Sequence, residues 1–182
     1  TATFDGSTVA LEALSATWQG GAMEGRAQLP RRLFEPAASA GPSPAPSGRV
    51  DVTLKGLTEQ ALVPWLPAAT IAGLEARVSA TLGLDLASLD PGGISGTLVL
   101  DEAAVTAAGV PIAQVQPSRL SIADGTLSFD DVAFSAGAPV VIAGTIAFGD
   151  ATALNVTLTG TPGLRPFSVL TPGIAMDGAA AL

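Results

Sequence analysis

The stretch that decides the fold is GLEARVSATLGLDL, residues 73–86. Every second residue from Leu74 to Leu86 is apolar. The residues between them are mostly polar or charged: Glu75, Arg77, Ser79, Thr81, Gly83 and Asp85. This period of two predicts a β-strand with one face shielded from water and one face in it. The strand is more than twice as long as the usual strand of about 5–6 residues.

Alternation of the same kind recurs along most of the chain, and we expect about eleven strands in total. A one-residue slip between Leu11 and Leu14 predicts a β-bulge near Ala13. Asp124-Gly125 is typical of a tight hairpin. The apolar run 137–148 is shorter than the roughly 18 residues of a membrane helix, and its β-branched residues favour a strand.

Two segments interrupt the alternation. Residues 35–48, EPAASAGPSPAPSG, predict a flexible Pro-rich surface loop. Residues 58–66, TEQALVPWL, predict a short helix with Thr58 as its N-cap and Pro64 limiting its length.

The composition excludes several functions. A net charge of −8 argues against nucleic acid as a partner, because phosphate binding needs clustered Lys and Arg. The chain contains no His and no Cys, which excludes Cys/His zinc sites and nucleophilic catalysis by Ser-His-Asp or Cys-His. We therefore predict no enzyme, no catalytic residue, no cofactor and no metal site. Asp130-Asp131 is interpreted as a pair of hairpin carboxylates rather than an acid–base pair.

The apolar residues must be spread over a surface rather than gathered in a ball. They make up 48% of the chain, but aromatic residues are only 4%, so the usual bulk of a compact core is missing. No helices long enough to cover a dry sheet face are predicted. We predict an all-β fold with one or two short helices. A solenoid with small side chains or a long curled sheet that forms a trough with an apolar inner face fits these residues, and Gly96 and Gly144, which interrupt the apolar face, favour the trough. The predicted lining residues are Val52, Leu54, Leu74, Val78, Leu82, Leu84, Leu98, Leu100, Leu120, Ile122, Phe129, Phe134, Ile142, Ile146, Phe148, Val156 and Leu158.

An internal repeat connects the two ends of the chain. VTLKG at 52–56 matches VTLTG at 156–160, an offset of 104 residues. Each copy is followed by a short Pro-bearing stretch. The chain starts at Thr1 without Met and ends inside an alternating pattern. We interpret residues 1–182 as one continuous repetitive β-sheet segment of a longer chain.

The run GLTEQALVPWLP…GLEARVSATLGLDLASLDPGGISGTLVLDEAAV, residues 56–105, resembles the AsmA-like/TamB family of translocation and assembly module subunits. Further signs are the unit DGTLSFDDVAF at 124–134 and the unit GTIAF at 144–148. The resemblance implies a β-sheet trough in the periplasm of a diderm bacterium, with the full-length chain anchored in the inner membrane outside this fragment. It implies transport of phospholipid, by its acyl chains, between inner and outer membranes. A partner in outer-membrane assembly is also implied.

Two alternatives remain open at the level of the residues. The apolar faces could form an ordinary closed core. The chain could also be a structural β-solenoid, such as an adhesin-type stalk, with a packed core and no lipid transport.

Overall fold

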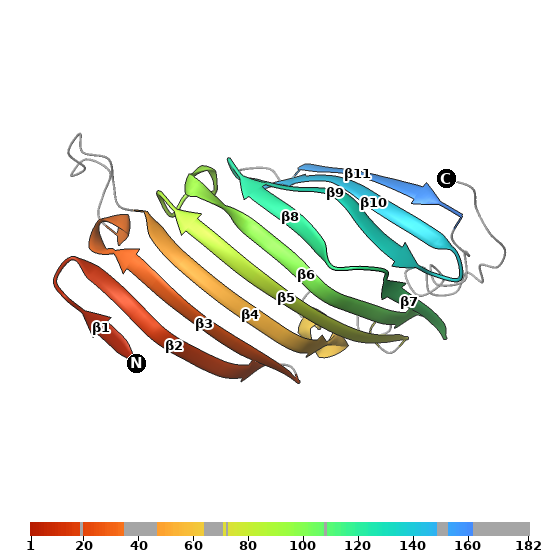
Figure 1. Ribbon diagram of the computed structural model, residues 1–182, viewed down its shortest axis with the longest axis horizontal. Coiled ribbons are helices and arrows are strands. Elements are labelled where there is room, and N and C mark those ends of the chain that lie inside the picture. The colour runs from red at the N-terminus through yellow and green to blue at the C-terminus, as the bar shows by residue number, and fades with distance from the viewer. Residues whose placement is uncertain are drawn as a thin grey trace.

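The computed structural model describes residues 1–18, 20–34, 47–63, 71, 73–107, 109–148 and 153–161. In this part of the chain, eleven strands form one sheet in which all neighbours are antiparallel (Figure 1). The strands are β1 (Ala2–Phe4), β2 (Thr8–Trp18), β3 (Gly21–Pro30), β4 (Gly48–Thr58), β5 (Leu74–Leu86), β6 (Ile94–Ala107), β7 (Val110–Gln114), β8 (Ser118–Ala123), β9 (Thr126–Ser135), β10 (Pro139–Ala147) and β11 (Ala153–Gly160). The all-β prediction with about eleven strands is confirmed.

The strands follow one another across the sheet in chain order, with one exception. β7 and β8 share a single position between β6 and β9, where β8 pairs with the first half of β6 and β7 with its second half. Residues 115–117 separate the two strands. The sheet is thus a meander with one interrupted strand, and its contacts are formed mostly between chain neighbours.

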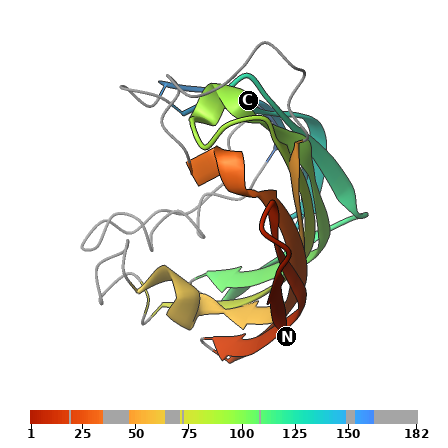
Figure 2. The same ribbon diagram turned by 90° about the vertical axis from the view of Figure 1, so that its left-hand side faces the viewer.

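The sheet is curled, and Figure 2 shows it as a C in cross-section. Directly opposed residues of an antiparallel pair point to the same face. The short 3-10 turn η1 (Arg31–Phe34) lies inside the C in Figure 2. A Cβ atom built on Gly48 would lie 2.7 Å from Leu33 of η1 and 3.1 Å from Leu29. The inner side is therefore the face that carries Leu29 and Leu86, the partner of Gly48. We call it the concave face and the opposite side the convex face.

Bulges explain why the apolar alternation slips along the chain. The register shifts in β2 between Leu11 and Leu14, as predicted, and again in β4, β6 and β9. At each shift, two successive residues face the convex side, so the apolar residues on both flanks stay on the concave face.

The bulge in β9 corrects one prediction. Asp130-Asp131 does not lie in a hairpin; it lies within β9, between Phe129 and Val132, and both carboxylates are exposed. The physical reason is that Phe129 and Val132 both belong on the concave face, and only an extra residue between them allows this.

One predicted connection, the hairpin at Asp124-Gly125, is present, whereas the predicted short helix is replaced by a 3-10 turn in its described part. Asp124-Gly125 forms the predicted two-residue hairpin, with φ of 50° and 69°. In the described part of the predicted helix, residues 58–63, the structure has only the 3-10 turn η3 (Glu59–Leu62), and Thr58 ends β4 in an extended conformation before it. Residues 64–66 of that prediction lie outside the described residues. A further 3-10 turn, η4 (Pro91–Gly93), lies between β5 and β6.

The Pro-rich loop falls mainly on residues 35–46, which lie outside the described residues. Its predicted end at residue 48 is wrong, because Gly48 already belongs to β4. The two copies of the repeated sequence lie in different strands: VTLKG at 52–56 lies in β4, and VTLTG at 156–160 lies in β11.

Candidate functional site: the concave apolar face

The concave face carries continuous apolar rows that cross the sheet from edge to edge. One row passes through Leu84, whose direct partners are Val50 on β4 and Gly96 on β6. Followed in both directions through the printed partners, this row consists of Ala2, Leu11, Ala27, Val50, Leu84, Gly96, Ile122, Leu127, Ile146 and Leu154. Every member is apolar or glycine, so hydrocarbon could follow the whole row without meeting a charged side chain.

The register places the predicted lining residues on this face, with one exception. From Val52 on β4 to Leu158 on β11, the predicted positions in strands all share the concave side. Phe148 lies just beyond the end of β10 and is 48% exposed. Its backbone N–H donates a hydrogen bond of 2.7 Å to the carbonyl oxygen of Gly125. Phe148 is therefore a residue of the sheet rim.

The face assignment within β5 follows the expected alternation. Leu82 pairs with Val52 and Leu98 on the concave face, whereas Arg77 is exposed on the convex face opposite Thr58 and Ala104. A slip of one residue would exchange these faces.

The sequence prediction missed part of the lining. The missed concave residues are spread over strands from β2 to β11: Leu11, Leu14, Met23, Val50, Leu57, Val105, Ile112, Leu127, Val132, Val140 and Leu154. Their alternation was visible in the sequence. For Leu14, Leu57, Val105 and Val132, the sequence did not show how a bulge joins an even-numbered run to an odd-numbered run on one face.

The described residues do not form a closed core. None of their large side chains falls below 2% exposure. The buried apolar residues are mostly alanines, such as Ala27, Ala80 and Ala103, whereas Leu82 and Leu98 on the concave face are only half-buried. Within a compact domain of this size, large aliphatic side chains are normally the most buried. In the described part of the chain, the concave face thus has apolar surface that other described residues leave partly accessible.

Two polar side chains stand on the otherwise apolar concave face, next to the interruption between β7 and β8. The Gln114 amide Nε2 donates to the carbonyl oxygens of Leu100, at 3.1 Å, and Gln116, at 2.7 Å. It also donates to the Ser118 hydroxyl at 3.1 Å. The Gln114 amide thus satisfies two backbone acceptors at the break, whereas its own Oε1 atom is buried without a hydrogen-bond partner. The pair is best explained as a structural link between the two short strands.

Neither a metal centre nor a membrane-spanning helix is found among the residues that the structure describes. No group of three or more Asp and Glu side chains there is arranged to hold a metal ion. No helix in the same residues is long and apolar enough to cross a membrane.

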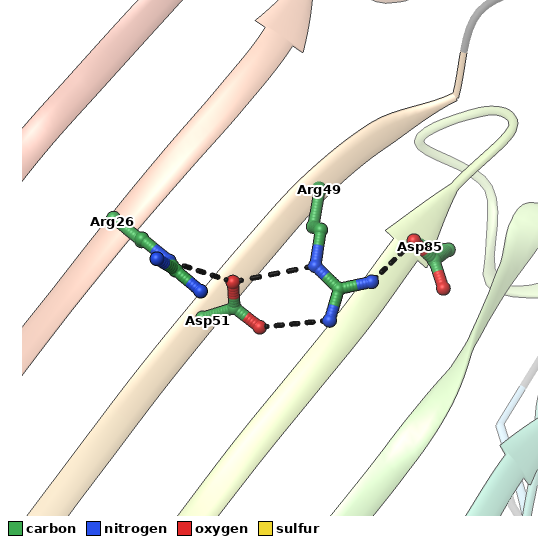
Figure 3. Close-up of polar contacts among 4 residues, drawn as sticks. All are labelled: Arg26, Arg49, Asp51 and Asp85. Carbon is green, nitrogen blue, oxygen red and sulfur yellow. Dashed lines mark hydrogen bonds and ion pairs between the residues drawn. The ribbon is translucent and has the colours of Figure 1, made fainter.

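The convex face, in contrast, carries the charged side chains of the strands β2 to β5. Asp51 on β4 accepts a hydrogen bond of 2.9 Å from Arg26 and one of 3.2 Å from Arg49, which also reaches Asp85 at 3.3 Å (Figure 3). These contacts connect β3, β4 and β5 on the side opposite the apolar rows. They help to fix the register that brings Val50, Val52 and Leu84 to the concave face.

This ion-pair group predicts a pH dependence. Hydrogen bonds from Arg49 and then Arg26 lower the pKa of Asp51, so its contribution to stability exists above the unfolded-state pKa of about 3.9. The contribution disappears as pH falls through the folded-state pKa. At pH 7, we expect Asp51→Asn to lower the free energy of unfolding by about 0.5 kcal/mol, because both arginine partners are exposed and solvent screens the ion pairs. Urea titrations at pH 7 and pH 3 should show the difference shrinking at pH 3. A difference that grows at pH 3, or Asp131→Asn behaving identically, would contradict the prediction.

No family model, curated protein or solved structure matches this chain significantly.

Proposed function

We propose that this chain is a segment of a periplasmic bridge-like protein that conducts phospholipids, or assists outer-membrane assembly, along its concave face. One observation carries the proposal. In the described strands, every concave position is apolar or glycine, except Gln114 and Ser118. The AsmA-like/TamB resemblance of the sequence supports the same function and adds the periplasm and the two membranes.

The dimensions of the sheet suit acyl chains. Ten strand positions at about 4.8 Å each give a concave face about 48 Å long. A strand like β5, at about 3.3 Å per residue, follows an arc of roughly 43 Å. An acyl chain reaches about 15 Å, half of a hydrocarbon layer about 30 Å thick. One strand can therefore pass around a tail and still form both rims of the trough.

The energetics favour a continuous apolar surface over a tight pocket. Each methylene group exposed to water costs about 0.8 kcal/mol, so two bare acyl chains would cost tens of kcal/mol in water. Rows of Leu, Val and Ile remove much of this cost at every point along the sheet. Because neighbouring rows are chemically alike, no single position holds a lipid strongly, and movement along the face has a low barrier.

The alternative function is a structural stalk. A β-solenoid stacks parallel rungs around a packed interior, whereas every strand pair described here is antiparallel and belongs to one sheet. The half-buried Leu82 and Leu98 also differ from the filled interior that a stalk requires. No observation on this sheet favours the stalk.

Photo-crosslinking tests the proposal at adjacent residues of one strand. Leu98 on β6 faces the concave side, and Val99 faces the convex side opposite Arg119. Benzoylphenylalanine placed at position 98 should crosslink to phospholipid when the protein is irradiated with phosphatidylethanolamine–phosphatidylglycerol vesicles. Mass spectrometry of the protein would detect the adduct.

The same substitution at position 99 is the matched control, since it differs only in the face. We expect at least about tenfold less lipid adduct there, because the convex face offers no apolar row. Equal labelling at both positions, or no lipid adduct at position 98, would rule out the concave face as a lipid path.

A further inference from the structure

We propose that the trough is hinged. Its two walls move relative to each other about a line of irregular pairing that crosses the sheet from β4 to β9, and the Gln114 side chain restrains this movement. The line, which we call the crease, consists of Lys55-Gly56, Asp101, residues 115–117 and Asp130-Asp131. This inference concerns movement of the sheet and stands independently of the lipid proposal.

The irregularities of β4 and β6 lie at the same level of β5. The β4 bulge falls between the residues of β4 that pair with Ala80 and Val78. The β6 bulge falls between the residues of β6 that pair with the same two residues. On the far side of β6, the break between β8 and β7 begins beyond Ser118, whose partner Leu100 is also the partner of Ala80 (Figure 1). The crease therefore crosses these strands without a step.

The crease continues into β9. β8 and β7 pair with β9 only on either side of the break, up to Ser128 and from Phe134 onward. The stretch of β9 between these two residues faces the break and contains the bulge at Asp130-Asp131. Within it, the Ala133 carbonyl oxygen accepts a hydrogen bond of 2.9 Å from the Val115 N–H. Irregular pairing thus reaches from β4 to β9, with β5 as the regular strand within it.

Side-chain hydrogen bonds replace parts of the backbone ladder along the crease. The Gly56 N–H donates to the Ser79 hydroxyl at 3.1 Å instead of to a backbone carbonyl. At the break, the Gln114 amide donates to the carbonyl oxygens of Leu100 and Gln116. Bulges bend a strand, and segments with fewer ladder bonds open at a lower free energy than regular strands. The crease is therefore the line along which the C in Figure 2 changes its curvature most easily.

Gln114 restrains the crease at its break. Its Nε2 atom joins β6 through Leu100, the connecting residues through Gln116, and β8 through Ser118, which is only 6% exposed. Its Oε1 atom is buried without a hydrogen-bond partner, and such an acceptor costs free energy. Movement that admits water to Oε1 supplies the missing partner. The same side chain therefore stabilises the bent sheet and also gains a hydrogen bond when the crease opens.

Movement about the crease changes the width of the trough. Val78 and Leu82 lie on the concave side of β5 on opposite sides of the crease, so each wall carries part of the apolar lining. From Ala80 to Leu86, β5 extends about 20 Å at about 3.3 Å per residue. A rotation of about 10° at the crease therefore moves this end of the wall by about 3–4 Å. Such a change is comparable to the separation of neighbouring side chains on a strand.

Distances between paired spin labels, measured by double electron–electron resonance, test the movement. The chain contains no cysteine, so two introduced cysteines are the only labelled residues. Glu75→Cys with Asp90→Cys places labels at exposed positions on opposite sides of the crease. Ser15→Cys with Asp90→Cys places both labels on one side, because the convex row from Ser15 reaches β5 at Thr81, beyond Ala80. We expect the distance distribution of the first pair to be at least about twofold broader than that of the second.

Gln114→Met, combined with the first label pair, tests the restraint. Methionine keeps the length of the side chain and removes the Nε2 donor, so the distribution should broaden by at least a further factor of about 1.5. Gln28→Met is the matched control, because Gln28 is exposed on the convex side of β3 away from the crease, and it should leave the distribution unchanged.

Two outcomes contradict the hinge. Equal widths for the two label pairs in the protein with native Gln114 would overturn the proposal, whether or not the Gln114→Met variant folds. A Gln114→Met variant with an unaltered circular dichroism spectrum and an unaltered distribution would overturn it as well, and so would equal broadening by Gln28→Met.

Discussion

Replacing Leu98 with aspartate should lower phospholipid transfer between vesicles about 100-fold while the sheet stays folded. Leu98 lies in the middle of the concave face, between Leu82 and Leu120. Placing an aspartate against hydrocarbon costs about 2.5–3.5 kcal/mol, and each 1.4 kcal/mol is a factor of ten. The side chain is half-buried rather than enclosed by the described residues, so the carboxylate can be hydrated when no lipid is present. Val78→Asp and Ile146→Asp should act in the same way.

The measurement is dequenching of a fluorescent phospholipid that moves from donor to acceptor vesicles, combined with circular dichroism and thermal melting. Val99→Asp is the matched control, because it adds the same charge to the convex face of the same strand, opposite Arg119. It should leave transfer unchanged. An unfolded Leu98→Asp variant would indicate a closed core, on the scale of the worst core mutations. A folded variant with full transfer would show that lipid does not pass this position.

Replacing Gly96 with alanine should lower the free energy of unfolding by about 2 kcal/mol, within the usual range of overpacking. A Cβ atom at this position would overlap the backbone carbonyl oxygen of Gly83 and lie 3.0 Å from the Cα and Cδ2 atoms of Leu84. β5 and β6 would have to separate where they pair. Because the contact is with backbone, a change of side-chain rotamer cannot relieve it. Urea denaturation followed by circular dichroism would measure the loss.

Gly92→Ala is the control for this prediction. Gly92 lies in the adjacent turn η4, and nothing lies within 4 Å of a Cβ atom built there. The free energy of unfolding should change by less than about 0.5 kcal/mol, as for an ordinary surface substitution. Equal losses in the two variants would mean that close approach of β5 and β6 is not what requires glycine at position 96.

The sequence by itself determined where most strands lie and which face of each strand is apolar. The alternation from Leu74 to Leu86 predicts both the length of β5 and its two faces, because the side-chain period of a strand is fixed at two. Asp124-Gly125 likewise predicts its hairpin, since a two-residue loop with positive φ favours these residues. These features depend on local geometry, which a short stretch of sequence specifies.

Other features of the fold depend on pairing with the adjacent strands and cannot be read from a short stretch of sequence. Asp130-Asp131 resembles a turn in the sequence and becomes a bulge only because β10 pairs on both sides of it. Residues 58–66 contain helix-forming residues, yet Thr58 is extended and held in β4 by its pairing with Arg77. Within the described residues 58–63, the predicted helix is therefore reduced to η3. Propensity is a weak preference that tertiary pairing overrides.

The concave surface itself was decided by the tertiary structure. The sequence shows separate apolar runs of even and odd number, such as Leu98–Leu100 and Ala103–Ala107. Only the bulge at Asp101, set by the pairing of β6 with β5, places both runs on one face. The curl of the sheet likewise arises from twist and bulges summed over many strands, and no single strand encodes it. The sequence therefore determined which side of each strand is apolar, and the pairing of the strands decided that these apolar sides form one continuous concave face.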